Sequence, residues 1–204
     1  MALDFTALQT EVFARGFDYL NDAGVGLTRV KRWINEANHE VDSMEKWDYT
    51  YANSSGVAPL TIADLRLVED VTLTVAATTL IGQDRAMLEA VYGTLTTNTA
   101  STPVYWYRSA PTIVTDYPLN TSLSISVRYW KFGPDLAAGA DVPLMPDRFR
   151  QVIVEKAVAK AFRDSNDPNA ANDCLAEAGR ILDVMRAELV PDYLIRAPAA
   201  AAGK

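Results

Sequence analysis

Apolar residues follow two different periods along this 204-residue chain, helical near both ends and strand-like in the middle. Near the ends they recur every three or four residues, which places them on one face of an α-helix. Between residues 56 and 132, short segments rich in β-branched and aromatic residues alternate with turn-forming residues. The two periods predict an α+β fold in which helices flank a β-rich insertion.

Two helices are predicted ahead of the β-rich segment. The first covers residues 5–20 and ends in the turn-forming stretch 21–26. Thr28 is a favourable N-cap for the second, because its hydroxyl can accept a hydrogen bond from a main-chain N–H of the first turn. Trp33 and Trp47 lie beside the apolar stripe of this second helix. The stripe consists of Val30, Ile34, Ala37, Val41 and Met44.

The middle of the chain is predicted to form a small sheet with one helix. Residues 53–56 are expected to be a loop, because Asn, Ser and Gly favour turns. The helix is expected at residues 83–92, with Met87, Leu88 and Val91 on its apolar side. The strands are expected at residues 58–62, 65–75, 104–107, 112–114 and 123–130.

Two more helices are predicted after a loop at residues 136–145. The first begins at Pro146 or Asp147, since proline suits the first helical position and a carboxylate suits the positive end of the helix dipole. The second begins after a chain break, where Asp167 can cap the helix and Pro168 can start it.

The apolar faces of these two helices require partners. The first has two apolar lines, so its non-polar face is wider than a single partner helix covers. The lines consist of Phe149, Ile153, Ala157 and Ala161, and of Val154, Val158 and Phe162. The second helix has the spacing of a packing seam, formed by Leu175, Ala178, Leu182, Met185 and Leu189. We expect the two helices to form a hairpin that packs on the Trp33 helix.

The predicted organisation is a helical bundle interrupted by a β-rich insertion. Its N-terminal helices occupy residues 1–55, the insertion 56–132, and the hairpin that completes the bundle 133–190. Residues 191–204 are expected to form an extended C-terminal arm. The residues expected to pack in the core or against another subunit are Trp33, Trp47, Phe149, Ile153, Phe162, Leu182 and Met185.

Composition excludes several classes of function. Hydrophobic residues make up 49% of the chain, enough for a core without disulfides, and the single cysteine cannot form one within the chain. The net charge of -7 disfavours a protein that grips duplex DNA from outside, because phosphates require clustered Lys and Arg. There is no signal-peptide pattern, and no window approaches the roughly 18 apolar residues of a membrane span. We therefore expect cytoplasmic synthesis and no membrane partner.

Metal binding is not predicted. His39 is the only histidine, and a zinc motif would need a second one four positions on, so we expect His39 on the polar face of its helix. Residues 164–167 begin like a calcium loop, but Asn169 stands where glycine is needed and Leu175 where glutamate is needed. A break between helices explains this segment better.

No catalytic residue and no cofactor site are predicted either. Glu36, Glu40 and Glu45 are spaced like the solvated face of a helix, with nothing nearby to tune their pKa values. The turn around Gly24 and Gly26 lacks the lysine of a phosphate-binding loop. One histidine and one cysteine on different predicted helices do not form a nucleophile pattern.

Two aromatic segments leave a binding function open. Residues 105–108 and 129–131 combine Tyr and Trp with a basic residue on predicted strands, and such segments can stack on single-stranded nucleic acid. Packing of these side chains on the helices is the favoured interpretation, because the chain has no surplus of basic residues. Cys174 is interpreted as a small residue near the core.

Several short motifs follow one another across roughly residues 28–190. In the first half, these are the sequence from Trp33 to Ala37, then Trp47, then the β-rich middle. In the second half they are Tyr129, Pro134, Asp135, Leu136, Asp141, Pro143, Met145, Pro146 and Phe149. The order of these motifs resembles that of bacteriophage head-to-tail adaptors, also called connectors or head-completion proteins.

The resemblance implies a non-enzymatic virion protein located at the neck, between the portal and the tail. It implies a homo-oligomeric ring, commonly of twelve subunits, with tail or stopper proteins below it and genomic DNA passing through its lumen without sequence readout. A C-terminal segment would bind the portal protein. In this chain that segment is the arm, with Tyr193, Leu194, Ile195 and Arg196 as contact residues.

Two alternatives stay open at this point. A stopper or tail-terminator ring would lie one layer lower in the neck and would need no portal-binding arm. A virion-associated cell-wall hydrolase would need a carboxylate such as Glu36 or Glu40 in a cleft.

Overall fold

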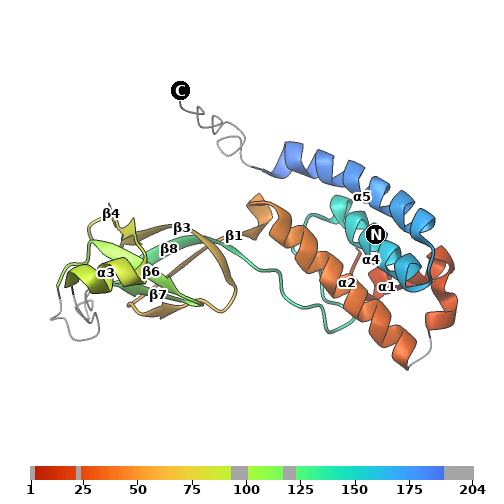
Figure 1. Cartoon of the computed structure of the whole chain (residues 1–204), viewed down its shortest axis with the longest axis horizontal. Coiled ribbons are helices and arrows are strands. Elements are labelled where there is room, and N and C mark those ends of the chain that lie inside the picture. The colour runs from red at the N-terminus through yellow and green to blue at the C-terminus, as the bar shows by residue number, and fades with distance from the viewer. Residues whose placement is uncertain (1–2, 22–23, 93–100, 117–122, 191–204) are drawn as a thin grey trace. The chain divides into compact units, whose positions relative to one another are not determined.

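The computed structural model describes residues 3–21, 24–92, 101–116 and 123–190, and the chain divides into two compact units (Figure 1). One unit, largely helical, comprises residues 1–50 and 133–204; the other, rich in strands, comprises residues 51–132. Each unit has its own hydrophobic core. The predicted mixed α+β class is confirmed.

The helical unit is built around one central helix. Its helices are α1 (Phe5–Val12), α2 (Val25–Met44), α4 (Gln151–Asp164) and α5 (Pro168–Leu189). Helix α4 contacts each of the other three, and even its charged residues Glu155 and Lys156 are buried. The prediction that this helix needs burial on more than one side is confirmed.

The first predicted helix is not continuous. Helix α1 ends at Val12, a π-helical turn follows at Phe13–Phe17, and a 3-10 turn follows at Asp18–Leu20. Gly16 interrupts the helix because its φ of 100° lies in the left-handed region. The sequence pattern alone did not reveal this interruption.

Helix α2 begins earlier than predicted, so the assignment of Thr28 as its N-cap is wrong. The cap residue is Gly24, and the Thr28 hydroxyl donates to the Gly24 carbonyl (3.2 Å) from within the first turn. Gly26 is required here, since a Cβ would lie 2.6 Å from the Leu20 carbonyl oxygen. The apolar stripe is buried as expected except at its last member, Met44, which is 42% exposed.

The C-terminal hairpin forms almost as predicted. A 3-10 turn, Asp147–Phe149, precedes α4, which places the regular helix start at Gln151 rather than at Pro146 or Asp147. Asp167 caps α5 by accepting a hydrogen bond from the Ala170 N–H (3.1 Å).

The β-rich unit contains two four-stranded sheets in its described residues, where the sequence predicted one. The first has the order β1-β8-β3-β4 and the second β2-β7-β6-β5. All neighbouring strands are antiparallel except β5 and β6. The strands are β1 (Tyr51–Gly56), β2 (Leu60–Thr61), β3 (Leu65–Leu73), β4 (Thr78–Thr79), β5 (Ile81–Gly82), β6 (Tyr105–Ser109), β7 (Thr112–Thr115) and β8 (Ile125–Lys131). Residues from both sheets form one shared core.

Strand β1 corrects the prediction of a loop at residues 53–56. It pairs with β8 at every one of its 6 residues. The Ser126 hydroxyl also donates to the side chain of Asn53 (2.9 Å). A polar segment with turn-forming residues becomes a strand here because β8 supplies a complete partner.

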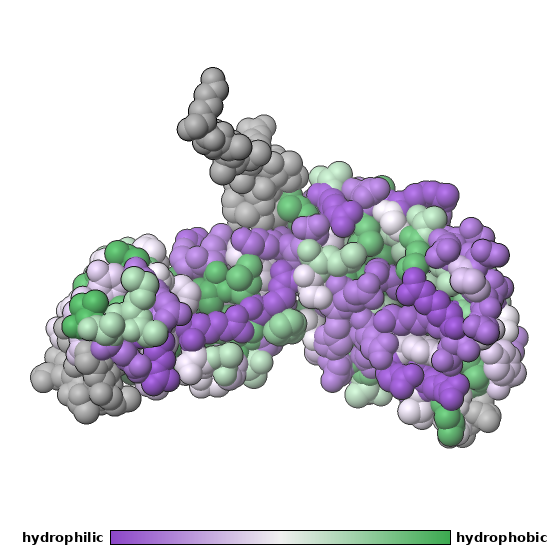
Figure 2. Space-filling view, in the orientation of Figure 1, coloured by the Kyte–Doolittle hydropathy of each residue, from purple (hydrophilic) through white to green (hydrophobic). Residues whose placement is uncertain are grey.

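Helix α3 (Arg85–Tyr92) packs on the second sheet through Leu88, which contacts Tyr107. The predicted apolar side is only partly buried, since Met87 is 61% and Val91 is 72% exposed. Exposed apolar surface is visible over this part of the unit in Figure 2.

Candidate functional site

Residues 133–146, which we call the strap, contain most of the second half of the motif order noted in the sequence. The strap has no regular secondary structure, as predicted, yet it is fixed to the helical unit along its length. Leu136, Pro143 and Met145 are buried, whereas Ala137–Ala140 are exposed. The strap is therefore an ordered surface element of the helical unit.

Asn35 holds the middle of the strap. Its side-chain N–H donates to the Leu136 carbonyl (2.9 Å), and its side-chain oxygen accepts from the Leu136 N–H (2.7 Å). One amide side chain thus satisfies both main-chain groups of a residue that has no strand or helix partner.

The turn at Asp141 is fixed by main-chain hydrogen bonds. The Asp141 carboxylate accepts from the Ala137 and Ala138 N–H groups, both at 2.7 Å, and these donors lower the pKa of Asp141. The Phe5 N–H donates to the Asp141 carbonyl (2.8 Å), which joins the strap to the start of α1.

Arg150 fixes the end of the strap. Its guanidinium is largely buried and donates to the carbonyls of Met145 (3.2 Å) and Pro143 (3.4 Å) and to the Asp147 carboxylate (2.9 Å). A buried guanidinium with several acceptors is well compensated for its loss of hydration.

The strap begins on a buried polar cluster of α2. Gly133 lies against Asp42 and Asn38, both buried, and a Cβ at this position would collide with the Asp42 carboxylate. Tyr49 donates its hydroxyl to the other Asp42 oxygen (3.0 Å). Only glycine allows the main chain to approach this carboxylate so closely.

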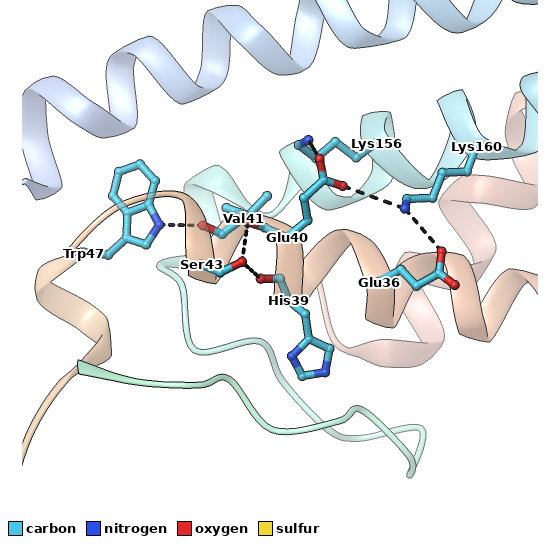
Figure 3. A network of polar contacts seen from close by, with 8 residues as sticks. All are labelled: Glu36, His39, Glu40, Val41, Ser43, Trp47, Lys156 and Lys160. Carbon is cyan, nitrogen blue, oxygen red and sulfur yellow. Dashed lines mark hydrogen bonds and ion pairs between the residues drawn. The ribbon is translucent and has the colours of Figure 1, made fainter. Parts of the chain in front are cut away.

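A ladder of ion pairs joins α2 to α4 (Figure 3). Lys156, with its side chain 7% exposed, pairs with Glu40 (2.6 Å), and Lys160 pairs with Glu36 (3.2 Å) and Glu40 (3.8 Å). Glu45 pairs with Arg186 of α5 (3.0 Å). Glu36 and Glu40 are exposed, as the prediction of a solvated face requires, and Glu45 is half-buried. All three carboxylates also pair with basic residues of α4 and α5, which the sequence did not predict.

A second buried charge of α4 faces a different neighbour. The Glu155 carboxylate accepts from Arg15 (2.7 Å) and from Gln151 (3.0 Å). A cavity of about 520 Å³ borders these residues and Cys174. Burial is the main cause that raises the pKa of the Cys174 thiol, which fits its predicted place near the core and keeps the thiol protonated.

His39 lies on the polar side of α2, as predicted. Its Nε2 is 2.7 Å from the Asp135 carboxylate of the strap. Within the described ranges, no group of three or more His, Cys, Asp or Glu side chains is arranged to hold a metal ion.

The two aromatic segments belong to the β-rich unit and contribute to its packing. Tyr107, Tyr129 and Trp130 are buried. Arg108 donates to the main-chain carbonyls of Arg66 (2.6 Å) and Leu65 (2.9 Å). Tyr107 packs on helix α3, as expected, whereas Tyr129 lies in the core shared by the two sheets rather than on a helix. Packing therefore accounts for these segments better than a nucleic-acid platform does.

The sequence-predicted packing residues come together in the core of the helical unit. Phe162 is partly buried, and its ring meets that of Phe17 edge-on at 4.9 Å. The buried members are Trp33, Trp47, Phe149, Ile153, Leu182 and Met185. The predicted arm residues Tyr193, Leu194, Ile195 and Arg196 lie outside the described residues.

Sequence reasoning missed the residues that hold the strap, namely Asn35, Arg150 and Gly133. Asn35 and Gly133 stand in or beside the motifs noted in the sequence, but no local pattern assigns them a contact about a hundred positions away.

No described helix is long and apolar enough to span a bilayer.

Comparison with known proteins provides the family. No curated protein matches the chain. The family model described as SU10 adaptor protein matches residues 5–200, which includes both units, the strap and the first part of the arm. The chain therefore belongs to the SU10 adaptor protein family, a family of phage head-to-tail adaptors.

Proposed function

We propose that this virion protein forms the ring that joins the portal to the tail at the neck of a tailed phage. The family match over residues 5–200 is the observation that carries the proposal, because it covers almost the whole chain rather than one module. A structural role is also supported because Glu36 and Glu40, two of the carboxylates that a hydrolase could use, are engaged in the ion-pair ladder.

The arm is the proposed contact with the portal protein. Tyr193, Leu194 and Ile195 supply apolar anchors and Arg196 supplies a charge, and the family match extends through all four. Apolar side chains on a short terminal segment gain much of their binding energy by entering a groove of a partner.

The ring, proposed to contain twelve copies, would leave a lumen for genomic DNA. The net charge of -7 supports this, since an acidic lining repels phosphates and lets DNA slide without being held. Tail or stopper proteins would bind below the ring.

Deletion of residues 191–204 tests the proposal. Purified full-length protein should bind capsids that carry a portal and appear as a ring at the neck in electron-microscope class averages. The deletion should abolish this binding, whereas truncation after Pro198, which keeps residues 193–196, should retain it. Unchanged binding by the deletion variant would favour the stopper or tail-terminator alternative.

A further inference from the structure

Strand β1 has one open edge. It pairs with β8 on one side without any shift of register. Among the described residues, no strand pairs with its other side, and β1 is the first strand in the order of its sheet. Figure 1 shows β1 as a strand of the β-rich unit.

The register determines which main-chain groups point away from β8. The Thr74 N–H donates to the Ser124 carbonyl (2.9 Å), so the main chain of Ser124 faces β3. Main-chain groups alternate sides along a strand, so the even-numbered residues of β8 face β3 and the odd-numbered residues face β1. The β1 partners of those odd-numbered residues are Ala52, Ser54 and Gly56. Tyr51, Asn53 and Ser55 therefore point their N–H and C=O groups outward.

This edge lacks the features that usually protect a strand from pairing with another chain. Its sequence, YANSSG, contains no proline and no charged residue. Its pairing with β8 contains no bulge, whereas β3 pairs with β8 through two register shifts. Six residues with three outward N–H groups and three outward C=O groups form a complete template for an added strand.

The arm contains a segment that matches this template in length. Pro191 and Pro198 cannot donate a main-chain hydrogen bond, and between them lie the six residues 192–197. Tyr193 and Ile195 are good strand formers, and Leu194 between them is apolar. The six residues between the two prolines include no glycine, which would weaken a strand.

We propose that residues 192–197 of a second copy of the chain pair with the open edge of β1 before the portal is met. Each copy has one such edge and one arm, so copies arranged head to tail, as in the proposed ring, use every edge and every arm. The same residues, Tyr193 to Arg196, are those assigned to the portal. The inference rests on that assignment. It implies that the arm first pairs with β1 and leaves this strand for the portal when the portal binds.

Disulfide trapping tests the pairing. In a Cys174→Ser background, one chain carries Asn53→Cys, and a second chain carries a single cysteine at Tyr193, Leu194 or Ile195. Mixing the two and oxidising should give a covalent dimer of unlike chains. A matched control with Val75→Cys, an exposed position outside the strands of the same unit, should give none. Equal trapping at both positions, or no covalent dimer of unlike chains at any of the three arm positions, would overturn the proposal.

Ser55→Pro provides the second measurement. The Ser55 N–H points away from β8, so proline at this position keeps the β1–β8 pairing but removes one outward donor. The trapped dimer should be lost with Ser55→Pro and retained with Ser55→Ala, while circular dichroism confirms that both variants fold. Trapping that survives Ser55→Pro contradicts strand pairing.

Portal binding separates this inference from the proposed function. Ser55→Pro should still bind portal-bearing capsids, because its arm is free, whereas deletion of residues 191–204 should lose both the trapped dimer and portal binding. If chains with Ser55 intact bind the portal but give no trapped dimer, the inference is removed and the proposed function stays intact.

Discussion

Single residues in this protein hold segments that have no regular structure, and Gly133 is the clearest case. Gly133→Ala places a methyl group against the buried Asp42 carboxylate. We expect a loss of about 1–3 kcal/mol in the free energy of unfolding, the usual cost of overpacking. Chemical denaturation followed by circular dichroism measures it.

Gly179→Ala is the matched control, since nothing lies within 4 Å of its added Cβ in the middle of α5. This control should stabilise the protein by about 0.5–1 kcal/mol, because alanine is the better helix former. An equal effect of the two substitutions would contradict the close approach at Gly133.

Tyr129 gives the β-rich unit a sensitivity to alkaline pH. Burial, together with its hydrogen bond to Asp64 (3.1 Å), raises the pKa of Tyr129 to about 12. In the unfolded chain the hydroxyl of this tyrosine ionises near pH 10. The stabilisation of the folded state by Tyr129 is therefore complete below pH 10 and is lost as the pH rises toward 12. Stability should therefore fall over this interval.

The measurement is a denaturant titration repeated at several alkaline pH values, with tyrosinate absorbance recorded in parallel. Tyr129→Phe should reduce the slope of stability against pH and remove one late-ionising tyrosine from the absorbance curve. Tyr51, whose pKa is also raised to about 12, should remain in that curve as an internal reference.

At the scale of elements, the ion-pair ladder stabilises the packing of α2 against α4. Glu40→Gln leaves the buried Lys156 ammonium without a carboxylate. We expect a loss of about 1–3 kcal/mol in the free energy of unfolding. Glu36→Gln is the control and should cost less than about 1 kcal/mol, because Lys160 is more exposed and still has Glu40 nearby.

The double variant Glu40→Gln with Lys156→Met completes the cycle. Removing both charges should recover most of the loss, since an apolar side chain suits the buried position. If the double variant is as unstable as Glu40→Gln, the unpaired ammonium is not the cause.

The strap depends on α2 through the side chain of Asn35. Asn35→Ala leaves both main-chain groups of Leu136 without their partner, so the strap should open locally while the helices stay folded. Limited proteolysis should then cut within residues 137–142 much faster than in the unsubstituted protein. Asn35→Asp, which keeps the acceptor for the Leu136 N–H, should give an intermediate rate.

At the scale of the whole molecule, the β-rich unit is an insertion with its own core. Its first strand and its last strand are neighbours, since Tyr51 is the register partner of Trp130. A separate fragment of residues 51–132 should therefore fold alone and unfold cooperatively, with a strand-rich circular dichroism spectrum. A fragment without a cooperative transition would show that this core depends on the helical unit.

The sequence by itself determined the features that depend on neighbouring residues. The 3.6-residue period gave the span of α5, and Asp167 with Pro168 marked its start, because capping and helix periodicity are local. The content of β-branched and aromatic residues located β8 and β3. The motif order gave the family, since the match depends on residue order and not on contacts.

Only the tertiary structure decided the features that depend on distant partners. The polar segment Tyr51–Gly56 is a strand because β8, more than sixty residues away, pairs with it. Glu40 belongs to an ion pair because α4 brings Lys156 beside it, and Asn35 holds Leu136 across a sequence separation of 101. No local pattern encodes such contacts, since each depends on which surfaces the whole chain brings together.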